Sequence, residues 1–160
     1  MTKSVKKILF KGGLVYDHYD DVHKPLAADV LVVDDRISDV GKGLPTIDVE
    51  VVDASNHLLV PGMVNAHYHS HDTLCRGLFE ELPLEYWLLY TLPMGAHRSG
   101  NEIRLRTMVG ALESMRCGIT TVQDMLGLIP LNEENLDVVI DTYQEIGERV
   151  IFSPMVFDIP

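Results

Sequence analysis

The pattern of apolar and polar residues changes near Leu58 and divides the chain into two parts. In the first part, short apolar or alternating runs are separated by turn residues, and none has the length or spacing of an amphipathic helix. The runs predict strands at 7–10, 13–16, 29–33, 36–40 and 49–52. Asp34 and Asp35 favour a hairpin turn between the third and the fourth of these strands. We therefore expect residues 1–57 to form a small β unit.

After Leu58, helix and strand patterns alternate. Apolar residues recur at helical spacing in three segments, and β-branched or apolar runs lie between and after them. The predicted helices are 83–92, 101–117 and 133–146, and the predicted strands are 119–124 and 150–157. Gly118 and Gly147 are expected C-terminal stops, and Asn132 is an expected N-terminal cap. Alternation of this kind is typical of an α/β fold with a parallel sheet or barrel.

The two parts meet in the stretch from Leu58 to His71, an apolar segment that ends in three histidines. His67, His69 and His71 are spaced two apart, so an extended chain would point their side chains to one face. Neutral imidazole is the commonest metal ligand in proteins, and a strand end holds it rigidly. An isolated pair of this kind is weak evidence, but the strand context makes His67 and His69 candidate metal ligands. His71 could contact substrate or the other ligands, or simply begin a helix.

Three further residues are candidates for the same site, each with a structural alternative. Asp124 ends a predicted strand and could orient a histidine from behind the metal ligands, or it could be an ordinary turn aspartate. Arg76 could contact substrate, although a surface ion pair is the commoner role. Trp87 lies in an aromatic segment that favours core or oligomer contacts, and it could also line a substrate pocket.

Composition narrows the class of protein. The chain has 160 residues, 46% of them hydrophobic and 23% charged, which is ordinary for a globular domain. Its formal net charge of −11 argues against a nucleic-acid or anionic-membrane partner, because no basic patch could offset phosphate repulsion. The two cysteines form no CxxC pair, and the apolar run at 8–10 is too short for a signal peptide. We expect a cytoplasmic protein.

Taken together, the motifs resemble the amidohydrolase superfamily. The resemblance rests on the segments VDA at 52–54, VPGMVNAHYH at 60–69, RGL at 76–78, LPLEYWL at 82–88 and GITTVQDM at 118–125. The last three are similar to its deaminase and chlorohydrolase branch, which includes guanine deaminase-like, adenosylhomocysteine deaminase-like and triazine hydrolase-like enzymes. The resemblance extends over nearly the whole chain, from Ile8 to Phe157.

The resemblance implies a metal-dependent hydrolase with a (β/α)8 barrel and a small β-sandwich. Residues 1–57 would be the N-terminal part of the sandwich, and residues 58–160 would supply the first three barrel strands. His67 and His69 would hold one divalent ion, zinc most readily and iron as the alternative. Water bound to that ion would act as hydroxide on a cyclic amidine or an aminated heterocycle, and ammonia, an amine or another group would leave.

The chain departs from this family in what it lacks. The other metal ligands and the acid–base groups would lie on later barrel strands, beyond Pro160, and two histidines do not complete a zinc site. We expect the N-terminal portion of a hydrolase that acts on a small-molecule substrate and associates as a homo-oligomer or with the rest of a barrel. The alternative is a non-catalytic fragment or interaction module. A metal-storage protein is a weaker hypothesis, because storage needs no barrel-like alternation.

Overall fold

The computed structural model describes residues 5–16, 21 and 23–156 and contains two compact units. Their boundary lies between Pro61 and Gly62, whereas the sequence pattern predicts it between residues 57 and 58. The difference arises because β5 (Leu58–Leu59) pairs with the sheet of the first unit. Each unit is described by itself.

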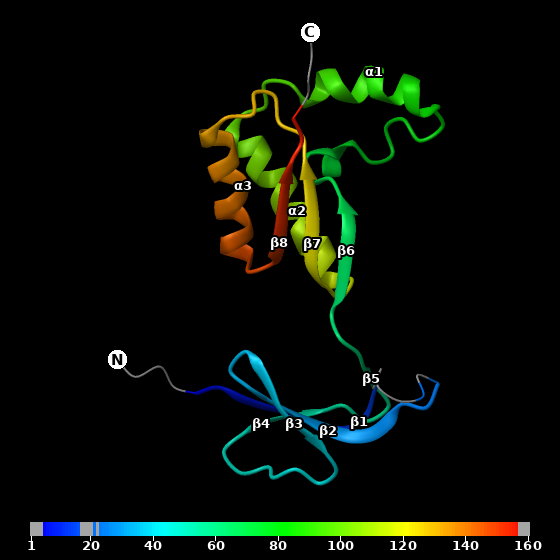
Figure 1. Ribbon diagram of the computed structural model, residues 1–160, viewed down its shortest axis with the longest axis vertical. Coiled ribbons are helices and arrows are strands. Elements are labelled where there is room, and N and C mark those ends of the chain that lie inside the picture. Colours follow the sequence, from blue (N-terminus) through cyan, green and yellow to red (C-terminus); the bar gives the residue numbers. More distant parts are fainter. Residues whose placement is uncertain (1–4, 17–20, 22, 157–160) are drawn as a thin grey trace. The chain divides into compact units, whose positions relative to one another are not determined.

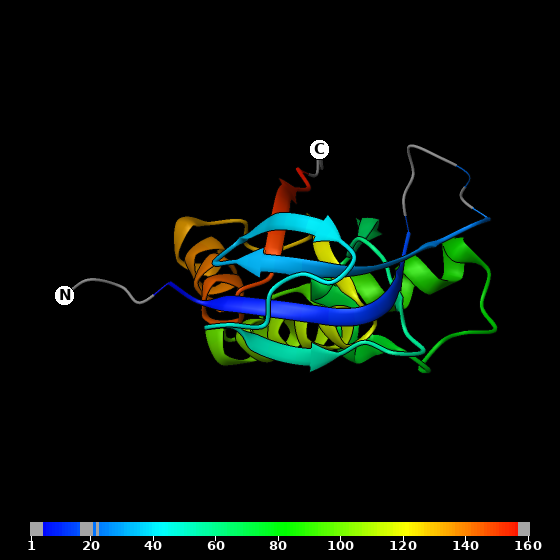
Figure 2. The ribbon, with the colours of Figure 1, turned by 90° about the horizontal axis from the view of Figure 1, so that it is seen from below.

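The first unit is a five-stranded mixed sheet in which β1 is central. Its strands are β1 (Lys7–Val15), β2 (Leu26–Val33), β3 (Arg36–Gly41), β4 (Glu50–Asp53) and β5. Figure 2 shows β1 between β2, which is antiparallel to it, and β4, which is parallel. Val33 pairs with Arg36, so the predicted hairpin at Asp34 and Asp35 is confirmed.

The prediction of separate strands at 7–10 and 13–16 is wrong. The two runs form one strand, β1, whose pairing register with β2 shifts between Phe10 and Gly13. Gly12 has a φ of 75°, which a glycine adopts without strain, and its amide donates a hydrogen bond to Asp29 Oδ1 at 2.8 Å. The glycine pair therefore makes a bulge inside a continuous strand rather than a break between two strands.

The second unit alternates strands and helices, which confirms the predicted α/β character. Its elements are β6 (Met63–Tyr68), the 3-10 helix η1 (Ser70–Cys75), α1 (Leu84–Gly95), α2 (Gly100–Arg116), β7 (Ile119–Leu126), α3 (Glu133–Ile146) and β8 (Arg149–Pro154). The three strands are parallel in the order β6-β7-β8, and α2 and α3 cover one face of their sheet (Figure 1).

The helix ends follow the sequence signals closely. The Asn132 side chain accepts a hydrogen bond from the Asn135 amide at the start of α3, and Gly147 ends that helix at a φ of 82°. Both predictions are confirmed. The strand predicted at 150–157 is shorter, because β8 stops at Pro154. Phe157 lies outside the described residues. No helix among the described residues is long and apolar enough to cross a membrane.

The core of the second unit lies between the sheet and the two helices that cover it. Val122 and Leu126 of β7 pack against Val139 and Tyr143 of α3, and all four are almost completely buried. The alternate residues of β7, such as Gln123, are only partly buried and point to the uncovered face. Within the second unit, the sheet therefore has one face packed against α2 and α3 and one open face that these helices leave uncovered.

Tyr68 inserts its hydroxyl between β6 and α2, against a glycine. A Cβ at position 110 would overlap Tyr68 Oη and come within 2.8 Å of Thr73 Oγ1. Burial raises the pKa of Tyr68 to about 12, so the hydroxyl stays protonated. Gly110 is therefore needed for the close approach of helix and strand rather than for a special backbone angle.

We expect Gly110→Ala to destabilise the chain by about 1–3 kcal/mol, because the added methyl must displace a buried tyrosine. Urea unfolding, followed by circular dichroism, measures the change. Gly100→Ala is the matched control in the same helix, since its Cβ would lie 3.6 Å from Val138 in ordinary contact. Equal effects of the two substitutions would contradict the packing argument.

Glu148 is a buried acid in front of β8. Its residue is 7% exposed, and neither carboxylate oxygen has a hydrogen-bond partner among the described residues. Burial, together with the nearby carboxylate of Asp124, raises the pKa of Glu148 to about 7. The folded chain therefore binds this proton more tightly than the unfolded chain does.

The pKa of Glu148 is higher in the folded chain than in the unfolded chain. The stability that Glu148 contributes is therefore present at low pH and is lost as pH rises through about 7. We expect Glu148→Gln to raise stability at pH 8 by up to about 3 kcal/mol and to change little at pH 5. Urea unfolding at both pH values measures this, with Asp141→Asn as an exposed control on α3. An equal gain at both pH values would rule out titration as the cause.

Candidate metal centre

His67 and His69 lie side by side at the end of β6. His67 is on the strand, and His69 directly follows it with extended backbone angles (φ −133°, ψ 90°), so the two side chains keep to one face. Their ring centres are 5.0 Å apart and the ring planes cross at 86°. The His67 amide donates to Asn65 Oδ1 at 3.2 Å, which steadies the strand at this point.

A backbone carbonyl sets the protonation of His69. Its Nδ1 lies 2.8 Å from the carbonyl oxygen of Met125, at the end of β7. A carbonyl only accepts hydrogen bonds, so Nδ1 carries the ring proton and Nε2 keeps a free lone pair. A ring held through one nitrogen and free at the other is the usual arrangement for a metal-binding histidine.

The two rings fit two positions around one metal ion. At Zn–N distances of about 2.0–2.1 Å, two imidazoles on a tetrahedral zinc have ring centres about 5 Å apart. The observed spacing of His67 and His69 matches this value. Within the described residues, no group of three His, Cys, Asp or Glu side chains could hold a metal. The pair therefore offers two ligands of the three or four that zinc takes from proteins.

His71 belongs to η1 rather than to the strand, as the helix-start alternative predicts. Its Nδ1 accepts a hydrogen bond from the Gly127 amide at 3.0 Å, so its ring proton sits on Nε2, 3.4 Å from Asp72 Oδ2. Burial is the main cause that lowers the pKa of His71, and the ring is neutral at pH 7. With both ring nitrogens engaged, His71 holds the end of β7 beside the metal ligands.

Asp124 contacts backbone and tyrosine rather than a histidine ring. It is completely buried; Oδ1 accepts from the Ser70 amide at 3.0 Å, and Oδ2 accepts from the Tyr143 hydroxyl at 2.9 Å. The proposed contact with a histidine ring is not formed, because Asp124 lies on the helix-covered face of β7, the same face as Val122. It nevertheless acts on the site, since Ser70 directly follows His69.

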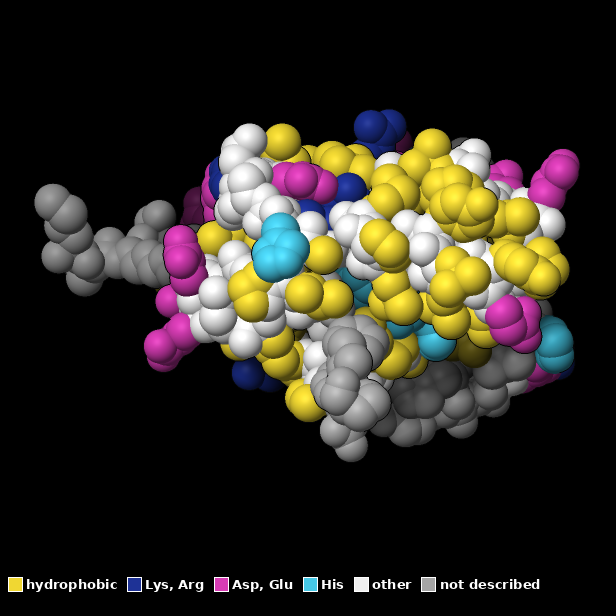
Figure 3. Space-filling view, turned by 90° about the horizontal axis from the view of Figure 1, so that it is seen from above, with side chains coloured by type: hydrophobic (Ala, Val, Ile, Leu, Met, Phe, Trp, Pro, Cys, Tyr) yellow, Lys and Arg dark blue, Asp and Glu magenta, His cyan; other side chains and the backbone are white. Residues whose placement is uncertain are grey.

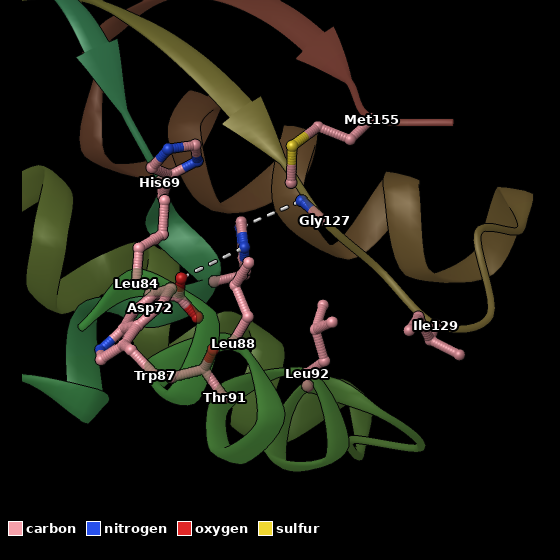
Figure 4. Close-up of a pocket in the computed structure, with 12 residues that line it drawn as sticks. His69, Asp72, Leu84, Trp87, Leu88, Thr91, Leu92, Gly127, Ile129 and Met155 are labelled. Atoms are coloured by element: carbon pink, nitrogen blue, oxygen red, sulfur yellow. Dashed lines mark hydrogen bonds and ion pairs between the residues drawn. The ribbon is translucent and has the colours of Figure 1, made fainter. Parts of the chain in front are cut away.

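A cavity of about 320 Å³ opens beside His69, between the ends of the strands and α1 (Figure 4). Its walls are mostly apolar. The lining residues are His69, His71, Asp72, Leu84, Trp87, Leu88, Thr91, Leu92, Gly95, Gly127, Ile129 and Met155. Apolar side chains also gather on the outer surface at this end of the second unit (Figure 3), among them exposed Tyr86 and Leu89 of α1. A flat apolar molecule of modest size could occupy the cavity next to a metal ion.

The two remaining candidates, Trp87 and Arg76, differ in whether they line the cavity. Trp87 lines the cavity, as a substrate-binding residue must. Arg76 is outside it, because its Nη2 forms an ion pair with Glu113 and its Nε donates to the Thr73 carbonyl. This is the surface ion pair that the sequence offered as its alternative. Sequence reasoning missed Asp72, which also lines the cavity and whose signal in the sequence was its place directly after His71.

Comparison with known proteins gives relatives of one kind. No protein-family model matches the sequence. The chain is 38% identical over 119 residues to the 5-methylthioadenosine/S-adenosylhomocysteine deaminase of Pyrococcus furiosus, a match to 74% of this chain and 28% of the relative. It is 35% identical over 131 residues to the 5'-deoxyadenosine deaminase of Methanothrix thermoacetophila, covering 81% and 30%. The chain thus spans less than a third of the length of these relatives.

Solved structures share the fold. A triazine hydrolase from Arthrobacter aurescens superposes with a TM-score of 0.86 at 26% identity, over 97% of this chain and 37% of that one. A mutant of the atrazine chlorohydrolase from the same species, complexed with zinc and atraton, matches 91% of this chain and 35% of its own with a TM-score of 0.78. Guanine deaminase from C. acetobutylicum matches in fold alone, at 19% identity and a TM-score of 0.77 over 98% and 38% of the two chains. The chain is thus similar in sequence to part of the Pyrococcus and Methanothrix deaminases and of the triazine hydrolase, which confirms the resemblance to the deaminase and chlorohydrolase branch of the amidohydrolase superfamily.

Proposed function

We propose that the chain is the N-terminal part of a metal-dependent hydrolase that removes the amino group of an aminated heterocycle. The observation that carries the proposal is the histidine pair itself. His67 and His69 have the ring spacing of two zinc ligands, His69 has its Nε2 free, and an apolar cavity opens beside it. The zinc complex of the related chlorohydrolase supports zinc as the metal.

In this proposal, β6, β7 and β8 are the first three strands of a (β/α)8 barrel, and the first unit is part of a β-sandwich. Supporting this, the strands are parallel and in sequence order, with helices on one face only. In such barrels the functional groups lie at the C-terminal ends of the strands, where the histidines are. The apolar residues Val64 and Ile151 are exposed on the uncovered face of the sheet, which supports burial of that face in a larger assembly.

The residues of this chain would hold the reactants. A zinc ion bound here would supply hydroxide at neutral pH. His67 and His69 would bind that ion, with the Met125 carbonyl keeping the His69 ring in position. Trp87 and the leucines of α1 would enclose the flat ring of the substrate and exclude bulk water from it, which strengthens the electrostatic interactions at the reacting carbon.

The names of the relatives suggest the substrate class. Methylthioadenosine, adenosylhomocysteine and 5'-deoxyadenosine all carry an adenine amino group and differ at the 5' position. We propose a 5'-substituted adenosine as substrate, with the amino group replaced by a carbonyl oxygen and ammonia released. Homo-oligomer formation, or association with the rest of the barrel, is part of the proposal, and a cytoplasmic location stays a prediction from the sequence.

Metal binding tests the histidine pair directly. With two of the ligands on this chain, we expect it to bind one zinc ion weakly, and His67→Ala and His69→Ala each to weaken that binding at least about tenfold further, because each removes a ligand. Isothermal titration calorimetry measures the affinity. His57→Ala is the control, since this exposed histidine belongs to the first unit, where its ring hydrogen-bonds the Ser55 carbonyl. Unchanged zinc affinity in His67→Ala would contradict the assignment of His67 as a metal ligand.

Ammonia release tests the reaction. The protein that carries these residues, purified with its natural partners and loaded with zinc, should release ammonia from 5'-deoxyadenosine and methylthioadenosine. Chelation should abolish the activity and zinc should restore it. We expect His67→Ala to lower kcat/KM on the order of a thousandfold, about 4 kcal/mol of transition-state stabilisation. Zinc binding without ammonia release from either compound would instead favour the non-catalytic alternative.

A further inference from the structure

Asp72 brings a carboxylate to a cavity whose other walls are largely apolar. Among the lining residues it is the only acid, and it shares the cavity with Leu84, Leu88 and Trp87. Its side chain is 22% exposed. A carboxylate that is partly removed from water is stable only when hydrogen-bond donors reach its oxygens. A ligand that fills the cavity and displaces water must therefore supply such donors.

The carboxylate is held in place by its neighbours (Figure 4). The Asp72 amide donates to the carbonyl of His69 at 3.2 Å, and Oδ2 faces the Nε2 proton of His71 at 3.4 Å. The His71 ring is fixed from its other side by the Gly127 amide. The main-chain carbonyl of His71 accepts hydrogen bonds from two buried guanidinium groups, from Arg98 Nη1 at 2.6 Å and from Arg106 Nη1 at 3.0 Å. The acid is therefore pre-positioned beside the candidate metal ligands.

We propose that Asp72 is a specificity-determining residue, which accepts hydrogen bonds from N–H or O–H groups of the substrate, and that His71 is its positioning residue. The inference rests on the proposed function: Asp72 is the hydrogen-bond acceptor for which the substrate must supply donors. In an adenosine the donors are of two kinds, the amino group of the base and the vicinal hydroxyls of the ribose. Either satisfies the carboxylate, since hydrogen bonds to an ionised acceptor are stronger than those between neutral groups.

The only tryptophan of the chain reports on this cavity. Trp87 lines it, so ligand entry can be followed by intrinsic fluorescence without any turnover. The chain, in excess zinc, would be titrated with adenosine, with 2',3'-dideoxyadenosine, which lacks the vicinal 2' and 3' hydroxyls, and with purine riboside, which lacks the amino group. Asp72→Asn keeps the shape of the side chain and removes its charge. Asp137→Asn, on the exposed side of α3, is the matched control.

We expect Asp72→Asn to weaken adenosine binding by about ten- to a hundredfold, and Asp137→Asn to leave it unchanged. The preference for adenosine over one analogue should shrink in Asp72→Asn. A smaller preference over the dideoxy compound identifies the hydroxyls as the donors, and a smaller preference over purine riboside identifies the amino group. Both preferences staying at their wild-type values would overturn the inference, as would the lack of any Trp87 response to adenosine.

His71 is tested through the same preference. His71→Asn can still accept from the Gly127 amide but cannot reach Asp72, whereas His71→Gln retains a donor at the position of Nε2. We expect the asparagine variant to lose the Asp72-dependent preference and the glutamine variant to regain part of it, at matched unfolding midpoints. Equal preferences in the two variants would contradict the positioning role. Ammonia release is read separately, so its absence together with normal ligand discrimination would refute only the hydrolase function.

Discussion

The buried carboxylate of Asp124 is the interaction on which the geometry of the site depends. It joins three elements, since it lies on β7 and accepts hydrogen bonds from the Ser70 amide at the start of η1 and from the Tyr143 hydroxyl of α3. Burial and the adjacent Asp124 charge raise the pKa of Tyr143, so the hydroxyl remains a donor. Without these bonds the carboxylate would be charged and unpaired in the core, which is costly. The turn after His69 is therefore fixed by the same contact that packs α3.

The two backbone groups that follow this carboxylate act on the histidines in opposite ways. The Met125 carbonyl can only accept, and it leaves the His69 proton on Nδ1; the Gly127 amide can only donate, and it leaves the His71 proton on Nε2. Neighbouring histidines thus have opposite tautomers, one with a lone pair available to a metal and one with a proton directed at Asp72. His69 and His71 have the same side chain, and the fold gives the two rings different tautomers.

Much of the fold follows from local sequence signals, and much of the site does not. Asn132 and Gly147 delimit α3 because capping and left-handed geometry act over a few residues. The pair His67 and His69 stands out for the same reason, as alternation along one strand is local. Asp72, by contrast, gains its importance from α1, which closes the cavity over it. Arg76 and Asp124 find partners 37 and 54 residues away, Glu113 and Ser70, and no local pattern predicts such pairings.

The use of main-chain groups to hold the histidines has a consequence for how the sequence can vary. Every amino acid at position 125 retains a carbonyl, so the orientation of His69 is insensitive to substitution there. Position 127 is different, because a Cβ would lie 2.8 Å from Met155 Cε and 3.0 Å from His71 Nε2. Substitution at position 125 can thus change the open face of the sheet without moving His69. At position 127, by contrast, any residue larger than glycine must displace the His71 ring or Met155.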